Sequence, residues 1–443
     1  MKRKIAAAAA IATATVLSAA ACSSSGTSTT GAQGTLSTDG KGKTITVWLQ
    51  QDAEKGWMDV VKSAEDQFTK ETGAKVSIQW QTWPNYSVKL DTALLSGNAP
   101  DAVEFGNTQT AKYIAAGALV DLTGVKSKFS NSGSWLDSLA ASGQSPQGKT
   151  YAVPYYAGVR TLIYRKDIFA AAGVTTPPTT FAELKADLDK VKAKNAGKSG
   201  FSTLYLPGKD WYVATAFGAD TYGTDGVIAN QTNGSWAGTL TEPNFIKGVK
   251  TWQQFQQDYS VGGTTVDESN QDQLMAKGNI AAIVGLGYEA STVSSNAPGA
   301  GGNPALADKL ATVALPSASG NGTMPQMLGG SDMAVPSKAK NPGLGAEFVR
   351  IFTDTQRQTM LAKYAIPNNK TLMSKYESVS PGNQASGQAA SGKTWFIPNS
   401  QFWSQASDET ALQNAYSAIA GGADPQKSLA TAQTTILGDL NGS

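Results

Sequence analysis

The chain has 443 residues, of which 40% are hydrophobic and 16% charged, so it is long enough to form two lobes with separate cores. Without the leader residues Lys2, Arg3 and Lys4, 33 basic residues face 34 acidic ones, and this balance gives no reason to expect nucleic-acid binding. The sequence contains no histidine, which excludes Ser-His-Asp catalysis, Cys-His pairs and histidine-based metal sites.

The amino terminus is typical of an exported protein. A basic start precedes an apolar, alanine-rich run that is too short for a comfortable membrane span but suits a signal peptide over residues 1–21. The run ends at Cys22, the only cysteine. Its surroundings resemble a bacterial lipoprotein signal, although Ala19 stands where leucine is usual; the alternative is a plain secretory signal with an incidental cysteine. We therefore expect acylation of Cys22, extracytoplasmic anchoring to the cell membrane, and a flexible Ser/Thr/Gly tether over residues 22–42.

Strands and helices alternate after the tether. Apolar residues at helical spacing over 52–72 end at Gly73, and two further helical patterns end at Gly97 and Gly117. Each helix follows a short run that suits a strand, and these runs lie at residues 44–49, 76–80 and 102–105. This order predicts crossover connections on a mostly parallel sheet, which is an α/β fold.

The stretch from Gly148 to Gly173 predicts a passage from one sheet to another. Two runs of β-branched and aromatic residues, 151–153 and 161–164, flank a corner that interrupts any simple hairpin. The corner carries Tyr155, Tyr156 and, at its far side, Arg160. These three side chains are left at the predicted junction.

The rest of the chain resumes the alternation. Thr180 and Glu183 form a capping-box pattern before a helix, and Pro243 is well placed to open another. Residues 280–284 predict a buried strand, and two helices close the chain.

Several stretches in this order resemble the family 1 extracellular solute-binding proteins of ABC importers, which include maltose-binding protein and many sugar-binding lipoproteins. The stretches are YSVKLDTALLSGNAPDAVEF (86–105), GKTYAVPYYAGVRTLIYRKDIFAAAG (148–173), PPTTFAEL (177–184), MAKGNIAAI (275–283), LGGSDMAVP (328–336) and FIPNSQFW (396–403).

The resemblance implies a two-lobed, type II periplasmic-binding-protein-like α/β fold, with the ligand cleft between lobes joined by crossing strands. Lobe 1 is then residues 43–156 and 315–366, and lobe 2 is residues 158–314 and 367–443. The stretch 148–173 would be the first crossing and 312–316 the second. The implied function is capture of a mono- or oligosaccharide by lobe closure and delivery to ABC permease subunits, by a monomer that is not an enzyme and needs no cofactor or metal.

Candidate ligand contacts follow from position and from the resemblance. The carboxyl ends of strands in open α/β sheets collect ligands, and a sugar site needs aromatic faces for the ring and polar groups for the hydroxyls. The candidates are Gln50, Gln51 and Asp52 after the first strand; Glu104 and Asn107 after the third; Tyr155, Tyr156 and Arg160 at the crossing; and Asp210, Trp211, Tyr288, Gly330, Ser331, Asp332 and Trp403 at family positions. We prefer Trp403 and Trp211 as stacking platforms. Asp52 could instead cap a helix, and Glu104 could be a solvated loop charge.

Other functions stay open. A secreted carbohydrate-active enzyme would need a carboxylate pair, which could come from Asp52, Glu104, Asp210 and Asp332. The same fold could bind ferric ion through paired tyrosines, or a polyamine or other cation through the acidic candidates. A lipoprotein that keeps the fold as an adhesin is a third alternative.

Overall fold

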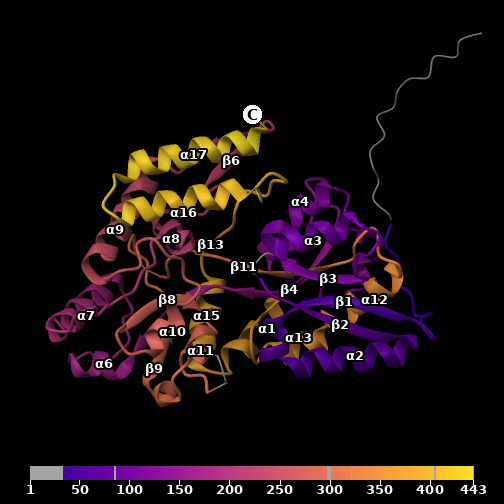
Figure 1. Ribbon diagram of the computed structural model, residues 1–443, viewed down its shortest axis with the longest axis horizontal. Helices are drawn as coiled ribbons and strands as arrows, with labels where there is room; N and C mark the ends of the chain where they lie inside the picture. Colours follow the sequence, from indigo (N-terminus) through magenta and orange to yellow (C-terminus); the bar gives the residue numbers. More distant parts are fainter. Residues whose placement is uncertain (1–32, 84–85, 297–300, 321, 404–405, 443) are drawn as a thin grey trace, which may run out of the picture. The chain divides into compact units, whose positions relative to one another are not determined.

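The computed structural model describes residues 33–83, 86–296, 301–320, 322–403 and 406–442. They form two α/β lobes, one around a six-stranded sheet and one around a three-stranded sheet (Figure 1). The predicted signal peptide and Cys22 lie outside the described residues.

The lobe 1 sheet has the strand order β12-β4-β11-β3-β1-β2. Strands β1 (Thr44–Gln50), β2 (Lys75–Gln81) and β3 (Ala102–Gly106) run parallel, which confirms the alternation expected from sequence. Three later strands extend the sheet antiparallel to their neighbours: β4 (Ala152–Gly158), β11 (Gly329–Ala334) and β12 (Ile366–Pro367). The carboxyl ends of β1 and β3 therefore meet at one edge.

Helices cover both faces of this sheet (Figure 1). On one face lie α2 (Met58–Thr72), α12 (Pro342–Phe352) and α13 (Thr355–Leu361), whose side chains share a core with Tyr155. On the other lie α3 (Tyr86–Leu95) and α4 (Thr110–Ala115), which pack around Phe105. As the spacing predicts, α2 buries one apolar stripe and ends at Gly73, where φ is 70°. Shorter elements fill the edges: α1 (Gln51–Gly56), α5 (Asp137–Ser142), and the 3-10 turns η1 (Asn107–Gln109) and η2 (Thr123–Lys128).

The lobe 2 sheet has the antiparallel order β8-β5-β9, formed by β8 (Ala282–Leu286), β5 (Arg160–Arg165) and β9 (Leu310–Val313). The helices around it are α6 (Lys166–Ala171), α7 (Phe181–Lys194), α8 (Trp211–Tyr222), α9 (Pro243–Tyr259), α10 (Gln271–Ala276) and α11 (Glu289–Val293), with the turn η3 (Pro304–Lys309). The predicted capping box is present at α7, where Thr180 Oγ1 accepts from the Glu183 N–H and the Glu183 carboxylate accepts from the Thr180 N–H. Pro243 opens α9 as expected.

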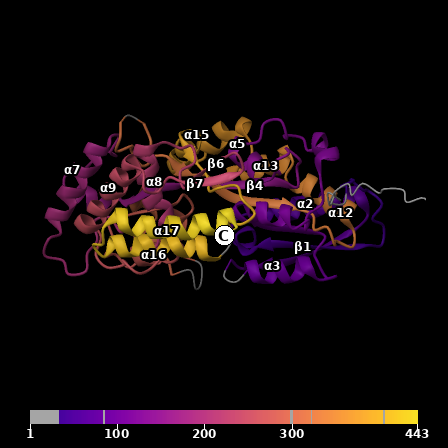
Figure 2. The same ribbon diagram turned by 90° about the horizontal axis from the view of Figure 1, so that it is seen from above.

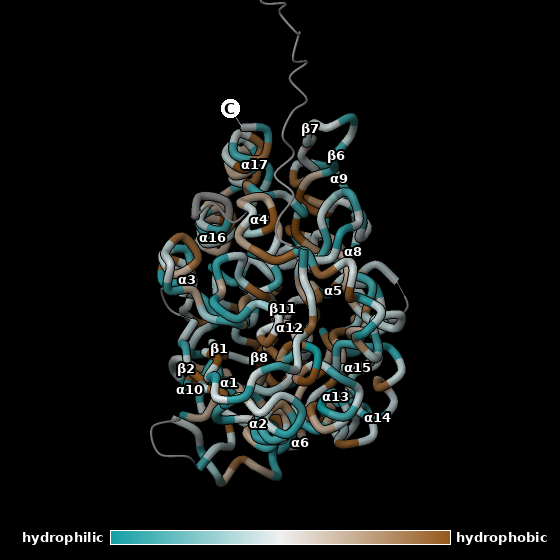
Figure 3. The backbone as a smooth tube through the Cα atoms, turned by 90° about the vertical axis from the view of Figure 1, so that its right-hand side faces the viewer, coloured by the Kyte–Doolittle hydropathy of each residue, from teal (hydrophilic) through white to brown (hydrophobic). Residues whose placement is uncertain are grey.

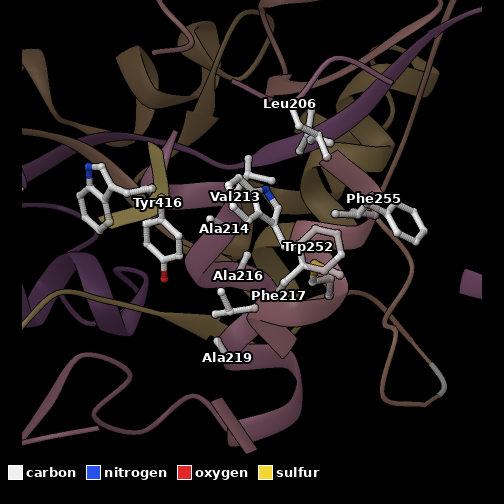
Figure 4. Close-up of a cluster of buried hydrophobic side chains, with 14 of the residues drawn as sticks. Leu206, Val213, Ala214, Ala216, Phe217, Ala219, Trp252, Phe255 and Tyr416 are labelled. Carbon is white, nitrogen blue, oxygen red and sulfur yellow. The ribbon is translucent and has the colours of Figure 1, made fainter. Parts of the chain in front are cut away.

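The core of lobe 2 is rich in aromatic residues. Figure 4 shows Trp252 from α9 among side chains of α8 such as Phe217, with Tyr416 of α16 (Ala406–Ala420) beside them. Helix α17 (Pro425–Asn441) lies alongside α16 in both ribbon views (Figures 1 and 2). Both hydrophobic and hydrophilic residues colour α17 in Figure 3, and one face of the helix is buried through Leu429, Ile436 and Leu440. A two-stranded hairpin, β6 (Ala229–Thr232) and β7 (Ser235–Gly238), completes this side.

The crossings between the lobes differ in part from the sequence-based boundaries. The first lies between β4 and β5 at Val159, within the predicted stretch. The second is not at 312–316, since Leu315, Met324 and Met327 pack in the lobe 2 core and β10 (Gln326–Met327) pairs with β13 (Thr394–Trp395). The chain re-enters the lobe 1 sheet only at Gly329, so the predicted boundary at 315 is wrong.

The third crossing also comes later than the predicted change at residue 367. Asn368 is fully buried in lobe 1, where its Nδ2 donates to the Pro154 carbonyl at 2.8 Å. The following turn η4 (Lys370–Leu372) and helices α14 (Met373–Glu377) and α15 (Pro381–Ser391) lead to lobe 2. An apolar group, here called the hinge cluster, joins residues of both lobes where the crossings meet: Leu136, Leu139, Ala157, Val159, Leu328, Ala362, Ile366, Met373, Tyr376, Ala389 and Ala390.

The predicted tether ends earlier than residue 42. Gly34 donates its N–H to the Asp121 carbonyl, Ser37 to the Gly343 carbonyl and Gly40 to the Thr72 carbonyl. Residues 33–42 are therefore fastened to lobe 1, because their backbone groups replace water with protein partners. Within the described ranges, no helix is long and apolar enough to cross a membrane.

The close pairing of β11 with β4 beside the hinge requires glycine at one position. A Cβ at Gly330 would overlap the carbonyl oxygen of Tyr156, whereas a Cβ at Gly329 would have open space around it. We expect Gly330→Ala to lower the free energy of unfolding by about 1–3 kcal/mol, because a clash with backbone is relieved only by moving a strand. Gly329→Ala is the matched control and should be near neutral. Urea unfolding of both variants measures the difference, and equal stabilities would contradict the expectation.

Candidate functional site

Polar side chains from four strands gather at the carboxyl edge of the lobe 1 sheet. The backbone N–H of Gln50, the last residue of β1, donates to Glu104 Oε2 on β3 at 2.9 Å. Ser331 on β11 pairs across the sheet with both Tyr156 on β4 and the end of β3. Asn107 follows β3 directly, in η1. Five predicted residues are thus brought together, and Gln50, Glu104, Asn107, Tyr156 and Ser331 are called the lobe 1 wall below.

Four members of the lobe 1 wall carry buried polar atoms that lack a hydrogen-bond partner among the described residues. These atoms are both amide atoms of Gln50, Oε1 of Glu104, Nδ2 of Asn107 and Oγ of Ser331. Gln50 and Glu104 are each 1% exposed. Because an unpaired buried polar atom is costly, such a group at one edge indicates a place where partners arrive from outside the chain.

Burial dominates the electrostatics of Glu104. It raises the pKa of this carboxyl to about 7 against the opposing effect of the Gln50 N–H, and Asp52 raises it further. The nearby Ser331 and Tyr156 hydroxyls lower it in part. Glu104 is therefore not the solvated loop charge that the sequence left open.

Asp52 lies at the rim of the lobe 1 wall and holds a tryptophan that the sequence analysis missed. Its Oδ2 accepts from Trp83 Nε1 at 2.7 Å, and the Trp83 ring is 41% exposed. The ring is perpendicular to the Tyr86 ring, with centroids 6.1 Å apart. Gln50, not Asp52, occupies the cap position of α1. Trp83 follows β2 by two residues, so the rule that strand ends collect ligands could have found it.

Three other lobe 1 candidates do not join the wall. Tyr155 is fully buried, accepts a hydrogen bond from Trp57 Nε1 and packs against Phe352, so it belongs to the core. Gln51 accepts from Lys55 in an exposed hydrogen bond within α1. Gly330 serves the close approach of β11 to β4. The prediction that Tyr155 contacts ligand is contradicted by its burial, which also removes one phenol from the proposed ferric-ion pair.

Asp332 is buried away from the wall. Its Oδ2 accepts from Thr110 Oγ1 at 2.6 Å and from Ser142 Oγ at 3.4 Å, and Oδ1 lacks a partner within the described part of the chain. Burial raises the pKa of this carboxyl to about 7, against the lowering effect of both hydroxyls. Its contacts make it a structural acid rather than half of a carboxylate pair.

Lobe 2 contributes a charged group next to the first crossing. Arg160, the first residue of β5, donates from Nη2 to Glu268 Oε1 at 2.8 Å, and its Nε lies 3.9 Å from Asp210 Oδ1. Its guanidinium carbon is 4.0 Å from the centroid of the Tyr212 ring, a cation–π contact. The structure thus joins the predicted Arg160 and Asp210 and adds two residues, Tyr212 and Glu268, that sequence reasoning missed.

Asp210 and Tyr288 present groups to the space beside Arg160. Asp210 caps α8 through Oδ1, which accepts from the Val213 N–H, while its buried Oδ2 has no partner among the described residues. Burial and then Glu268 raise the pKa of Asp210 to about 8, against the effect of Arg160. Tyr288 follows β8, and 59% of its surface is exposed. Desolvation of its hydroxyl raises the pKa most, followed by Glu289 and then by Asp52 of lobe 1. The two lobes are therefore within electrostatic reach here; Arg160, Asp210, Tyr212 and Tyr288 are called the lobe 2 wall below.

The two tryptophans predicted as stacking platforms are core residues. Trp211 is 1% exposed and Trp403 is not exposed at all. Trp211 stacks on Tyr212 at a centroid distance of 4.0 Å and packs against Trp395 and Trp403 at 6.2 Å. Neither ring presents a face to a ligand, so this prediction is contradicted. Trp211 instead supports the Tyr212 ring on which Arg160 lies.

The described residues offer no metal centre of the usual kind. No group of three or more Asp, Glu or Cys side chains in these ranges is arranged to hold an ion. The chemistry that the two walls can perform is hydrogen bonding, charge pairing and contact with aromatic faces.

Asp332 gives the protein a pH-dependent stability that can be measured. Its pKa in the folded state exceeds the unfolded value of about 3.9, so its contribution is greatest at low pH and is lost as pH rises through about 7, by up to about 1.4 kcal/mol per pH unit. We expect the melting temperature of Asp332→Asn, relative to the unmodified protein, to improve from pH 5 to about pH 7 and to level off above that, because both states of the unmodified protein are then deprotonated at this position. Asp225→Asn, at an exposed position, should give a constant offset. A constant offset for Asp332→Asn as well would contradict the assignment.

Comparisons with known proteins agree with this geometry. The model of a family described as bacterial extracellular solute-binding protein matches residues 63–375. Diacetylchitobiose binding protein DasA of Streptomyces coelicolor is 30% identical over 408 residues, which are 90% of this chain and 89% of the relative.

Solved structures share the fold. The GacH receptor of Streptomyces glaucescens matches with a TM-score of 0.72 and 21% identity, covering 90% of this chain and 98% of that chain. The sugar-binding protein MalE of Xanthomonas citri matches with a TM-score of 0.74 and 17% identity over the same shares. With two lobes joined by crossing strands, buried polar atoms left unpaired at the strand ends, and a family match over most of its length, the chain belongs to the bacterial extracellular solute-binding proteins.

Proposed function

We propose that this protein captures a mono- or oligosaccharide in a cleft between its lobes and delivers it to the permease of an ABC importer. The observation that carries the proposal is the set of unpaired, buried amide, carboxyl and hydroxyl atoms of the lobe 1 wall. Amide and carboxyl groups are the usual partners of sugar hydroxyls, since they donate and accept in fixed directions. The 30% identical relative named for diacetylchitobiose binding supports a carbohydrate.

Aromatic rings at the rim suit the flat faces of a sugar. Trp83 is held by Asp52 and is 41% exposed, and Tyr288 is 59% exposed on the lobe 2 side. A sugar ring placed between them would have apolar contact on its C–H faces and polar partners around its edge. These two residues replace Trp211 and Trp403 as the proposed platforms.

Closure about the crossings would couple capture to delivery. The hinge cluster joins both lobes through apolar contacts, which permit small rotations more readily than fixed hydrogen bonds. Ligand favours the closed state because only there do both walls contact it, and the shift cannot exceed its differential affinity for the two states. The closed form is the state that the permease would recognise, with the protein acting as a monomer.

The anchor is a separate part of the proposal. The signal and Cys22 would place the protein outside the cytoplasmic membrane on an acyl chain, with the segment from Cys22 to the first fastened residues as the link. Cys22→Ser should move the protein from the membrane fraction into the soluble extracytoplasmic fraction. Retention of the variant in the membrane would contradict acylation at this position.

A ligand screen tests the function directly. The mature protein is heated with a panel of mono- and oligosaccharides, and with ferric ion and polyamines as competing solutes. A specific ligand at a hundred times its dissociation constant adds about 2.7 kcal/mol to the free energy of unfolding, which gives a clear rise in melting temperature. A rise with saccharides supports the proposal, and a rise only with metal or polyamine would overturn the substrate.

Trp83 provides a sharper test with a matched control. We expect Trp83→Ala to weaken binding of the best saccharide by about tenfold, equivalent to about 1.4 kcal/mol, through loss of the ring face. Stability should change little, because the ring is 41% exposed. Tyr364 is also 41% exposed and also donates to an aspartate, Asp59, but lies on α13's side of lobe 1, so Tyr364→Ala should leave affinity unchanged. Isothermal calorimetry measures both, and equal effects would remove Trp83 from the site.

A further inference from the structure

We infer that the cleft prefers a saccharide that carries a protonated amino group, that is, an amino sugar with a free ammonium, over its neutral counterparts. This rests on the proposed capture of a saccharide and specifies the chemical class. The argument comes from the charges that surround the two walls and from the atoms that those charges leave unpaired.

Among the residues that the structure describes, the carboxyl group of the lobe 1 wall has no salt-bridge partner. Glu104 is anchored through Oε2 by the Gln50 N–H, while Oε1 is buried and lacks a partner among the described residues. The charged group that acts on it is the Asp52 carboxylate, which has the same sign. A buried carboxylate is normally paired with a cation. A ligand ammonium would supply that cation, whereas a hydroxyl would supply only a neutral hydrogen bond.

The groups that face Glu104 from the neighbouring elements add no positive charge beside its carboxyl. From α3, the Tyr86 hydroxyl donates to the Glu104 backbone carbonyl at 2.6 Å. From β4 and β11, the hydroxyls of Tyr156 and Ser331 lie near enough to lower the pKa of the carboxyl in part, although neither makes a hydrogen bond of normal geometry with Oε1. Tyr155 also lies on β4, with its hydroxyl committed to Trp57. All these groups are neutral or acidic.

The positive charge of the lobe 2 wall, on Arg160, already has acidic partners. Arg160 pairs with Glu268 at 2.8 Å and lies 3.9 Å from Asp210, so one guanidinium faces two carboxyl groups. Glu289 adds a further acid that acts on both Arg160 and Tyr288. Oδ2 of Asp210 stays buried and unpaired within the described ranges. Each wall therefore presents one buried carboxyl oxygen that has no hydrogen-bond partner within the described ranges. Arg160 Nε is also buried without a hydrogen-bond partner there, but its guanidinium already faces two carboxyl groups, so acidic groups outnumber the one cation.

The aromatic rim suits the same ligand. An ammonium next to an aromatic face gains a cation–π contact, as Arg160 does over Tyr212. Trp83 and Tyr288 present exposed rings at the rims of the two walls. A sugar ring with an amino substituent could therefore stack and pair its charge at once.

Binding should also release a proton. Below about pH 7 the buried Glu104 carboxyl of the free protein is largely protonated, and an ammonium ligand favours the carboxylate. Affinity for the charged ligand should therefore rise from pH 5 to pH 7, and calorimetry in buffers of different ionisation enthalpy should detect the proton.

The experiment compares three disaccharides of matched linkage on the full mature protein: one with free amino groups, its N-acetylated twin, and the plain glucose disaccharide. At pH 7 we expect the ammonium form to bind at least tenfold more tightly than either neutral form, with an affinity that falls as salt is raised. In Glu104→Gln the ratio of charged to neutral affinities should fall toward one and proton release should disappear. Glu242→Gln, an exposed acid at the start of α9, should keep the ratio of the unmodified protein.

The outcomes separate the two proposals. Equal or tighter binding of a neutral disaccharide to the unmodified protein would overturn the ammonium preference and leave saccharide capture standing. A preference that Glu104→Gln retains in full would also overturn the inference. If none of the three binds, and a wider saccharide panel also fails, the proposed function itself is overturned. The ratio and the salt dependence in the unmodified protein decide the matter even if Glu104→Gln does not fold.

Discussion

The hydrogen bond from the Gln50 N–H to the Glu104 carboxyl organises the site. It exists because β1 and β3 are parallel neighbours, so that their carboxyl ends meet and the last N–H of one strand faces a side chain of the other. It fixes one carboxyl oxygen and leaves the second unpaired among the described residues. Ser331 and Tyr156 then reach the same edge from β11 and β4 through ladder pairing. The lobe 1 wall is thus a consequence of sheet topology rather than of a loop that folds over a ligand.

The hinge follows from the same sheet. Strands β4 and β11 belong to lobe 1, yet β4 runs into β5 and β11 is entered from β10, both in lobe 2. The close approach at Gly330 ties β11 to β4 where these connections leave. Arg160 stands one residue past Val159 of the hinge cluster, so a rotation about the crossing would move the lobe 2 wall against a lobe 1 wall that the sheet keeps rigid.

The sequence predicts what periodicity and strand order control. The position of Gln50, Glu104 and Asn107 at one sheet edge is predictable because parallel strands end at the same edge, and the Thr180 capping box is predictable because its pattern is local. Tertiary burial depends on residues far apart in the sequence, so local patterns do not reveal it. For this reason the sequence predicts Trp211 and Trp403 as stacking platforms for a sugar, although their rings lie in the lobe 2 core. The predicted lobe boundary at residue 315 is wrong for the same reason, because Met324 and Met327, which lie in a Gly- and Ser-rich stretch, pack into that core. Trp83 follows the second strand, β2, whereas the contacts predicted at strand ends in lobe 1 follow the first and third strands.

A buried carboxyl oxygen without a partner among the described residues destabilises the ligand-free protein, and in the proposed function this cost is what makes the site selective. If Glu104 were solvated, a ligand would exchange one set of partners for another with little gain, and a neutral and a charged sugar would differ little. Because Glu104 is 1% exposed and Asp52 repels its charge, the free site holds a proton that a ligand cation can displace. The same burial disfavours ligands that lack a matching group, because they leave the Glu104 carboxyl oxygen without a partner in the closed state. Closure strengthens the distinction, since expelling water lowers the effective dielectric around both walls and increases the difference between a paired and an unpaired carboxylate.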